Sequence, residues 1–254
     1  MPPLPPSPRP VLRPLGVWMI AVPYMALAVS LGFLLAPFVG RRRAFWLLAP
    51  GWIRQIASSF GVRRHLVGWE ALPEVLKTAH SPAIFVANHA SYFDPPLLIS
   101  TLPCRPVFMA KKELAYIPFL GWLIWLAGFI FVDRGRQSRA AASLRGAARL
   151  IREGQSIAAF PEGTRTRTGS ILPFKRGVFI LAKEAGVPVV PMAILGGFRA
   201  LPPNAWRVAP GEYTIRVGAP LWPQDFPHAQ ALMQATEEAV HRLMAEGGHA
   251  AYRS

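Results

Sequence analysis

The sequence predicts an α/β fold in which a mixed, largely parallel sheet is flanked by helices and preceded by an N-terminal membrane-associated helical region. From about residue 65 onward, short apolar runs such as AIFVA and SIAAF alternate with longer helical stretches. This alternation is typical of strands that are joined by crossover helices. Before them, the stretch between Arg13 and Arg41 carries no charge. A chain of 254 residues is long enough for one sizeable α/β domain with an appendage.

The uncharged stretch predicts a membrane anchor. A helix from Val17 to Gly40 would be about 36 Å long, enough for a hydrocarbon core of about 30 Å. A cleaved signal peptide has a shorter apolar region and ends at a small-residue cleavage site, whereas this run ends in three consecutive arginines. We therefore expect a retained anchor. Prolines within and after the run also allow it to bend back, so a spanning helix and a re-entrant hairpin both stay open.

The following segment, residues 44–62, predicts an interfacial helix. It mixes aromatic and aliphatic side chains with Arg54. Tryptophans beside arginines place rings at the level of lipid headgroups and charges toward lipid phosphates. We therefore divide the chain into a Pro- and Arg-rich N-terminus with a membrane-anchoring helical region, residues 1–62, and a globular domain, residues 63–254.

Within the globular domain, four apolar runs predict strands and two longer stretches predict helices. The runs are AIFVA (83–87), IFV (130–132), SIAAF (156–160) and VPVVPMAI (187–194). Residues 136–154 are rich in Ala, Leu and Arg and close with Gly154, which suits a helix end. Residues 225–246 form the second helix, with one apolar stripe of Leu232, Thr236, Ala239, Val240 and Leu243 before a Gly-Gly pair.

The composition favours an anionic partner. Hydrophobic residues make up 52% of the chain and charged residues 16%, and 28 Lys and Arg against 13 Asp and Glu give a net charge of +15. A surplus of this size suits nucleic acid, an acidic membrane surface or phosphorylated substrates. The single cysteine, Cys104, excludes an internal disulfide and a cysteine-rich metal site.

A histidine and an aspartate follow the first predicted strand. His89 comes two residues after the run 83–87, and Asp94 comes five residues later. A helix brings residues i and i+4 together and a strand places i and i+2 on one face, so the two side chains meet only if the chain turns between them. Pro95 and Pro96 then mark the start of the next element. The sequence therefore predicts a loop that aims an imidazole at a carboxylate.

Two further predicted strands also end in polar residues. These are Asp133-Arg134 and Glu162-Gly163-Thr164-Arg165. Gly163 permits a tight turn, and the guanidinium fork of Arg165 beside it suits bidentate binding of a phosphate. Because open α/β sheets bind ligands at the carboxyl ends of their strands, we expect the three strand ends to form one shared site.

In this order, the blocks resemble the glycerolipid acyltransferase family, in particular its 1-acylglycerol-3-phosphate acyltransferases of the bacterial membrane type. The matching blocks are Asn88-His89-x4-Asp94, AKKELAYIPFLGW (110–122), FVDRGR (131–136), FPEGTR (160–165) and LPFKRGVFILAKEAGVPVVPMAI (172–194). They cover roughly residues 80 to 195. The resemblance implies a glycerophosphate acyltransferase-like fold, with residues 63–254 as the catalytic domain.

The resemblance also implies a reaction. The protein would transfer a fatty acyl group from an acyl thioester to the sn-2 hydroxyl of lysophosphatidic acid, which gives phosphatidic acid for phospholipid synthesis. His89 would be the general base for that hydroxyl, and Asp94 would orient it and stabilise the imidazolium. The chain has no Gly-x-Ser-x-Gly nucleophile elbow. We therefore do not expect an acyl-enzyme on Ser91 or Cys104.

By the same resemblance, the phosphate pocket is formed by Arg134, Glu162, Gly163, Thr164 and Arg165. Asn88 would support the histidine loop, and three lysines would reach the phosphates of the lipid or the acyl carrier: Lys111, Lys112 and Lys175. No metal or other cofactor is expected, because the other histidines lack ligand spacing. The co-substrate would be acyl-CoA or acyl-acyl-carrier-protein. The partners would be lysophosphatidic acid and membrane lipids, not nucleic acid, at the inner membrane with the catalytic domain on the cytoplasmic side.

Two alternatives stay open. A related acyltransferase would act on a lyso-ornithine lipid or another lysophospholipid, since Arg134 and Arg165 favour a phosphate monoester without excluding a zwitterionic headgroup. A non-enzymatic basic protein would bind membranes or nucleic acid by charge. The second alternative accounts for the net charge of +15 but leaves the His-x4-Asp and Glu-Gly-Thr-Arg blocks without a role.

Overall fold

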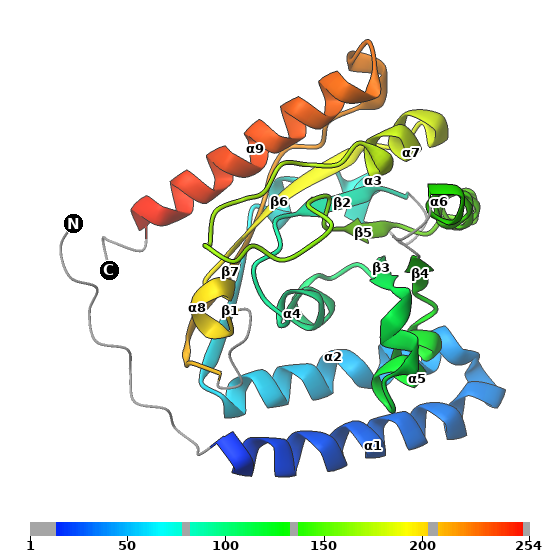
Figure 1. Ribbon diagram of the computed structural model, residues 1–254, viewed down its shortest axis with the longest axis vertical. Coiled ribbons are helices and arrows are strands. Elements are labelled where there is room, and N and C mark those ends of the chain that lie inside the picture. The colour runs from blue at the N-terminus through cyan, green and yellow to red at the C-terminus, as the bar shows by residue number, and fades with distance from the viewer. Residues whose placement is uncertain (1–13, 78–81, 133–136, 203–207, 251–254) are drawn as a thin grey trace.

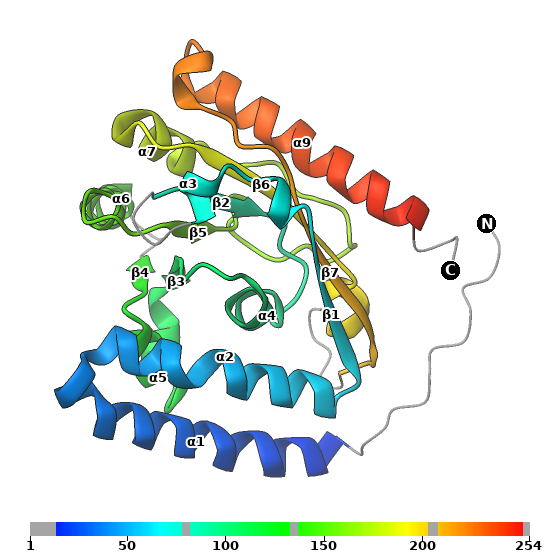
Figure 2. The ribbon, with the colours of Figure 1, turned by 180° about the vertical axis from the view of Figure 1, so that it is seen from behind.

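A seven-stranded sheet lies between two layers of helices (Figures 1 and 2). The structure is a computed structural model that describes residues 14–77, 82–132, 137–202 and 208–250. The strands are β1 (Val62–Val67), β2 (Ile84–Ala87), β3 (Val107–Lys111), β4 (Ile130–Val132), β5 (Ile157–Ala159), β6 (Val189–Leu195) and β7 (Gly211–Val217).

The order of the strands is β1-β7-β6-β2-β5-β3-β4. All neighbouring strands are parallel except β6 and β7, which are antiparallel. The strands from β6 to β4 therefore place their carboxyl ends at one edge of the sheet. The predicted α/β fold with a mixed, largely parallel sheet is confirmed, and the four apolar runs form β2, β4, β5 and β6.

The helices cover both faces of the sheet and form an N-terminal hairpin (Figures 1 and 2). They are α1 (Pro14–Val39), α2 (Arg41–Ser59), α3 (Glu74–Lys77), α4 (Asp94–Thr101), α5 (Leu120–Ala127), α6 (Gln137–Arg152), α7 (Gly177–Ala185), α8 (Gly197–Ala200) and α9 (Ala229–Ala250), with 3-10 turns η1 (Trp69–Ala71), η2 (Lys112–Tyr116) and η3 (Pro223–Asp225). Gly154 lies just after α6 with a φ of 80°, so the helix ends where the sequence predicts. α9 continues through the Gly-Gly pair, four residues beyond the stretch that predicted it.

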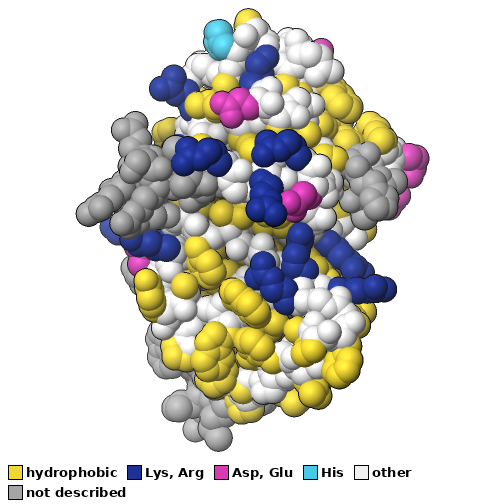
Figure 3. Space-filling model, turned by 90° about the vertical axis from the view of Figure 1, so that its right-hand side faces the viewer, with side chains coloured by type: hydrophobic (Ala, Val, Ile, Leu, Met, Phe, Trp, Pro, Cys, Tyr) yellow, Lys and Arg dark blue, Asp and Glu magenta, His cyan; other side chains and the backbone are white. Residues whose placement is uncertain are grey.

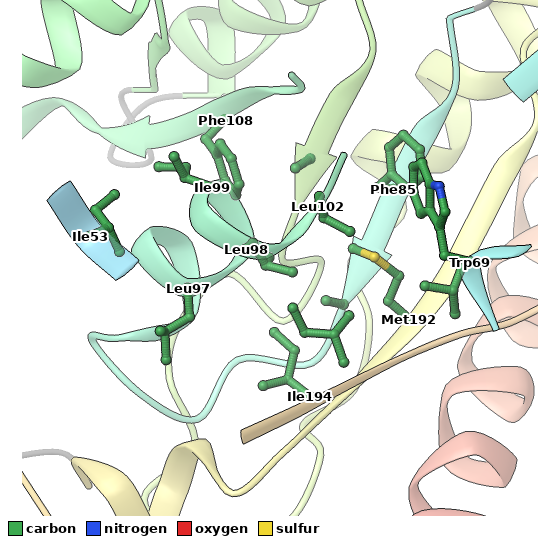
Figure 4. Packing of buried hydrophobic residues seen from close by; sticks show 14 of the residues in the cluster. Ile53, Trp69, Phe85, Leu97, Leu98, Ile99, Leu102, Phe108, Met192 and Ile194 are labelled. Atoms are coloured by element: carbon green, nitrogen blue, oxygen red, sulfur yellow. The ribbon is translucent and has the colours of Figure 1, made fainter. Parts of the chain in front are cut away.

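The core has two halves, one on each face of the sheet. Successive residues of β2 point to opposite faces: Ile84 and Val86 pack with the layer of α6, α7 and α9, while Phe85 packs with the layer of α4 and α2. Figure 4 shows Leu98 of α4 between the sheet and Ile53 of α2. Because both faces are covered, these strands read in the sequence as continuous apolar runs, not as alternating ones.

The N-terminal helices α1 and α2 run side by side in opposite directions, below the α4 layer (Figures 1 and 2). In α1, the stretch Val22–Val39 has a mean hydropathy of 1.9, and only 11% of it is buried inside the protein. This helix is long and apolar enough to cross a membrane. The predicted apolar helix is therefore present.

Helix α2 lies against the protein core, which corrects the predicted interfacial helix over residues 44–62. Phe45, Trp46 and Ile53 are buried, and the helix packs on α4 and α5. The rings of Phe45 and Trp46 find protein partners there, so these two rings are not available to lipid headgroups. The division of the chain at residues 62 and 63 stays a prediction, although α2 shares the core of the α4 layer.

Candidate active site

The strand ends that predicted a shared site lie at one edge of the sheet, here called the site edge. β2 and β5 are parallel neighbours with Ile84 opposite Ile157, so the segments that follow them leave the sheet together. β4 ends at the same edge, two strands from β5, which is about 10 Å at the usual strand spacing. Arg134 follows β4 but lies outside the described residues.

The chain turns sharply between His89 and Asp94, and the two side chains meet. The Nδ1 atom of His89 lies 2.8 Å from the Oδ2 atom of Asp94. The turn is possible because Asp94 starts α4, with Pro95 and Pro96 in its first turn. The side chain of Asp94 is fully buried, while that of His89 keeps 17% of its surface exposed. The loop therefore presents the imidazole and hides the carboxylate.

Four donors converge on the Asp94 carboxylate. Its Oδ2 atom accepts hydrogen bonds from His89 and from the amides of Ala90 and Ser91, at 2.7 and 2.8 Å. Its Oδ1 atom accepts one from the Tyr213 hydroxyl at 2.9 Å. Burial, aided by the charge of Asp94, raises the pKa of Tyr213, so the phenol stays protonated and can donate. All four groups donate, so the Asp94 carboxylate acts only as an acceptor.

This arrangement fixes the tautomer of the histidine. Because Asp94 acts as the acceptor, the Nδ1 atom of His89 carries the hydrogen and the Nε2 atom keeps a free lone pair. The ring also stacks on Phe160, with centroids 4.1 Å apart and planes 17° from parallel. An imidazole held in this way can take a proton from a hydroxyl group that is placed beside Nε2.

Asn88 ties the start of the loop to β6. Its side-chain amide donates to the carbonyl of Ile194 at 3.1 Å and accepts from the amide of the same residue at 2.7 Å. The side chain thus pairs with β6 as a backbone peptide of β2 would. This geometry fits the predicted support of the histidine loop.

Glu162 connects the histidine loop to the segments after β5. One of its carboxylate oxygens accepts from the amide of His89 at 2.6 Å and the other from the amide of Leu172 at 3.0 Å. The residue is 2% exposed, and burial raises the pKa of Glu162 to about 7. This geometry favours a positioning role for Glu162; its predicted contact with a phosphate stays a prediction.

Two cationic side chains flank the turn at Gly163, where φ is 73°. The Nζ atom of Lys175 would lie 2.8 Å from a Cβ atom built on Gly163, so the amine passes directly over the glycine. The guanidinium of Arg165 lies over the ring of Tyr92, 3.3 Å from its centroid. Within the part of the chain that the structure describes, its Nη1 atom is buried without a hydrogen-bond partner. A buried donor of this kind favours an anionic ligand.

The remaining predicted binding residues lie around this edge. Thr164 is exposed in the turn between Gly163 and Arg165. Lys111 ends β3, the neighbour of β5, and pairs with Glu113 at 3.7 Å. Lys112 begins η2. Their roles in binding stay predictions.

Ser91 and Cys104 are not arranged as nucleophiles. The hydroxyl of Ser91 is fully buried, donates to the carbonyl of Leu201 at 2.9 Å and accepts from the amide of Phe93 at 3.1 Å. Burial raises the pKa of Cys104 to about 12, so its thiol stays protonated near neutral pH. Both observations agree with direct transfer to a hydroxyl acceptor.

Sequence reasoning missed several residues that shape the site. Tyr213 lies 119 positions from Asp94, so no local spacing could reveal it. Tyr92 and Phe160 stood inside recognised blocks as unassigned aromatic residues. Gly197 permits close packing, since a Cβ atom there would lie 2.6 Å from the Oδ1 atom of Asp94. Across the described residues, no group of three or more His, Cys, Asp or Glu could hold a metal ion.

Comparisons with known proteins support the resemblance. The 1-acyl-sn-glycerol-3-phosphate acyltransferase of Cocos nucifera is 36% identical over 166 residues, 65% of this chain and 53% of that protein. The enzyme of the same name from Haemophilus influenzae is 39% identical over 127 residues, 50% of this chain and 53% of that protein. The chain thus spans about half the length of these curated relatives.

A solved structure matches nearly the whole chain. The crystal structure of the 1-acyl-sn-glycerophosphate (LPA) acyltransferase PlsC from Thermotoga maritima superposes with a TM-score of 0.77 and 28% identity, covering 92% of this chain and 93% of that one. The family model described as Acyltransferase matches residues 63–195, more than half of the 254 residues. The chain therefore belongs to the acyltransferase family.

Proposed function

We propose that this protein transfers a fatty acyl group from an acyl thioester to the sn-2 hydroxyl of lysophosphatidic acid, forming phosphatidic acid for phospholipid synthesis. The names of the relatives and of the Thermotoga maritima structure support this activity. The observation that carries it is the His89–Asp94 pair, in which a buried carboxylate with four hydrogen-bond donors holds the imidazole.

The proposed reaction proceeds without an acyl-enzyme. The Nε2 atom of His89 takes the proton of the sn-2 hydroxyl while its oxygen attacks the thioester carbonyl carbon. The carbon–sulfur bond then breaks, and the leaving thiolate takes the proton back from the imidazolium. Asp94 stabilises the imidazolium between these steps. General-base catalysis of this kind contributes about 10²- to 10⁴-fold to the rate.

The glycerol phosphate is proposed to bind at the turn around Gly163. The buried guanidinium nitrogen Nη1 of Arg165 and the amine of Lys175 supply positive charge there, and Thr164 and Arg134 are proposed to complete the pocket. A bound phosphate would hold the free hydroxyl near His89, which turns binding energy into orientation of the reacting groups.

The acyl donor is proposed to be acyl-CoA or acyl-acyl-carrier-protein, and no further cofactor takes part in the proposed reaction. We place the protein at the inner membrane with the catalytic domain on the cytoplasmic side, where these soluble thioesters are made. The apolar helix α1 supports membrane association. The net charge of +15 suits an anionic leaflet.

The test uses the full chain in lipid vesicles with lysophosphatidic acid and a labelled acyl thioester, and it measures labelled phosphatidic acid. Parallel reactions offer acyl-CoA or acyl-acyl-carrier-protein as donor, and lyso-ornithine lipid or lysophosphatidylcholine as acceptor. His89→Ala is the matched control. Product from another acceptor but not from lysophosphatidic acid would overturn the acceptor assignment. Absence of product from every pair would overturn the proposed activity.

A further inference from the structure

The block at residues 110–122 has no role in the proposed chemistry beyond its lysines, and it forms an exposed apolar surface. The block supplies η2 and the start of α5. We call residues 112–127, from the start of η2 to the end of α5, the η2–α5 segment. The segment exposes Tyr116 to 82%, Ile117 to 46%, and Trp122 and Trp125 each to 48%. Such a cluster of large apolar side chains is unusual on a soluble surface and typically marks an interaction site.

The backbone of the segment holds these side chains in place. Phe119, the residue just before α5, has a φ of 61°, a conformation that residues other than glycine rarely adopt. Its ring packs edge-on against Trp122, with centroids 5.2 Å apart. A Cβ atom at Gly121 would collide with the carbonyl oxygen of Ala115, so η2 and α5 pack as closely as their backbones allow. Strained backbone of this kind persists where the surrounding structure fixes it for function.

The exposed surface continues onto the apolar helix α1. Trp125 stacks on Phe33 of α1, with ring centroids 5.8 Å apart and planes 10° from parallel. α1 itself exposes Phe33, Leu34 and Phe38 to 42%, 64% and 80%. Figure 3 shows hydrophobic side chains gathered over the lower part of this side of the molecule, with a row of Lys and Arg side chains above them. The two elements therefore form one continuous apolar surface.

The charges beside this surface identify its partner. Arg41, Arg43 and Lys111 are exposed, and the guanidinium of Arg41 lies over the ring of Trp125, 4.9 Å from its centroid. Tryptophan and tyrosine next to arginine and lysine are the residues that occupy the headgroup region of a bilayer. A partner surface that is acidic alone would match the basic residues but not the aromatic ones. An anionic leaflet matches both.

We propose that the η2–α5 segment is a second membrane-binding surface, which inserts Tyr116, Ile117 and Trp122 into the headgroup region of an anionic leaflet beside α1. This inference goes beyond the proposed acyl transfer and does not depend on it. It predicts that the segment between β3 and β4 touches lipid whenever the protein is bound to a membrane.

The only cysteine of the chain makes a direct test possible. Cys104→Ser gives a background into which Ile117→Cys is introduced and labelled with the polarity-sensitive dye NBD. The full chain is mixed with vesicles of phosphatidylglycerol and phosphatidylethanolamine, with and without lipids that carry a nitroxide near the headgroup. We expect a blue shift of NBD emission and strong quenching by the shallow nitroxide. A label at Tyr116→Cys should respond in the same way.

Two matched labels make the outcome decisive. Gln234 is exposed on α9, a helix that lies on the far side of the sheet from α1 (Figure 1). Gln234→Cys should show neither change, and Leu34→Cys on α1 should show both. If the label at residue 117 behaves like that at residue 234 while that at residue 34 responds, the proposal is wrong. If no label responds, the protein does not bind this membrane and the proposal is equally wrong. A blue shift at residue 117 without quenching would indicate burial against a second protein copy, which also contradicts the proposal.

Discussion

Two regions of the molecule differ in what they bury. The site edge of the sheet buries polar groups, whereas the surface formed by α1 and the η2–α5 segment exposes apolar ones. At the site edge, Asp94 and Glu162 are buried but each oxygen accepts a hydrogen bond. On the helical surface, Phe38 and Tyr116 are about four-fifths exposed. Buried carboxylates are costly unless they are bonded, and exposed aromatic side chains lose the stabilisation that burial gives. We propose that each region serves a neighbour other than water: a reacting hydroxyl at the site edge and lipid at the helical surface.

The largest expected effect comes from His89→Ala, which removes the base but keeps three of the four donors that hold Asp94 in the loop. The variant should fold and bind vesicles as the parent does, and its turnover should fall by about 10²- to 10⁴-fold. Asp94→Asn should also be severe, because it removes the charge and the orientation together. Initial rates on purified protein check both. A variant without His89 that keeps more than about a tenth of the turnover would show that another group is the base.

Two truncations sharpen the distinction between the helices of the hairpin. A chain that starts at Arg41 lacks α1 and should fold but bind vesicles weakly. A chain that starts at Gly61 also lacks Phe45, Trp46 and Ile53, whose burial stabilises the fold by about 5 kcal/mol or more. Because domains are typically stable by about 5–15 kcal/mol, the shorter chain should aggregate or unfold. Circular dichroism and gel filtration compare the two; a folded, monomeric shorter chain would contradict the assignment of α2 to the core.

A smaller effect is expected from the pH dependence of Glu162. Its pKa is raised from 4.5 to about 7, so between these values the folded state holds a proton that the unfolded state has released. The stability that protonation gives is present below about pH 4.5 and is lost as the pH rises through 7, by about 3 kcal/mol in all. Glu162→Gln cannot titrate. Melting temperatures from pH 4.5 to 8 should therefore fall more steeply for the parent than for the variant, and parallel curves would contradict this prediction.

The smallest expected effects concern Arg165 and Tyr92. Arg165→Lys keeps the charge but loses the planar fork, and it should raise the KM for the lysolipid more than it lowers kcat. Tyr92→Leu removes the cation–π contact, worth about 0.5–1 kcal/mol, and should raise the same KM several-fold. The KM for the acyl thioester should change little in both. If only the donor KM rises, Arg165 binds the acyl carrier instead.

The sequence predicts four of the seven strands, because β2, β5 and β6 are buried on both faces and appear as continuous apolar runs. The strands β1, β3 and β7 were not predicted. The sequence also predicts that His89 and Asp94 meet across one turn of the chain, because the His-x4-Asp block and the later blocks follow one another in the order of the family. It does not predict the hydroxyl of Tyr213, because Tyr213 lies on β7, 119 positions from Asp94 in the sequence. The burial of α2 was equally hidden, because an amphipathic helix has the same pattern whether it faces lipid or a protein core.

The tautomer of His89 tests the central claim most directly. Nitrogen-15 labelling of the histidines, with the His89 signals assigned by their absence from the His89→Ala spectrum, reports which ring nitrogen carries the hydrogen. The four hydrogen bonds to Asp94 predict a neutral ring protonated at Nδ1, with a free Nε2 that can accept a proton. A neutral ring protonated at Nε2 would contradict the account, because such a histidine could not take the proton from the acceptor hydroxyl.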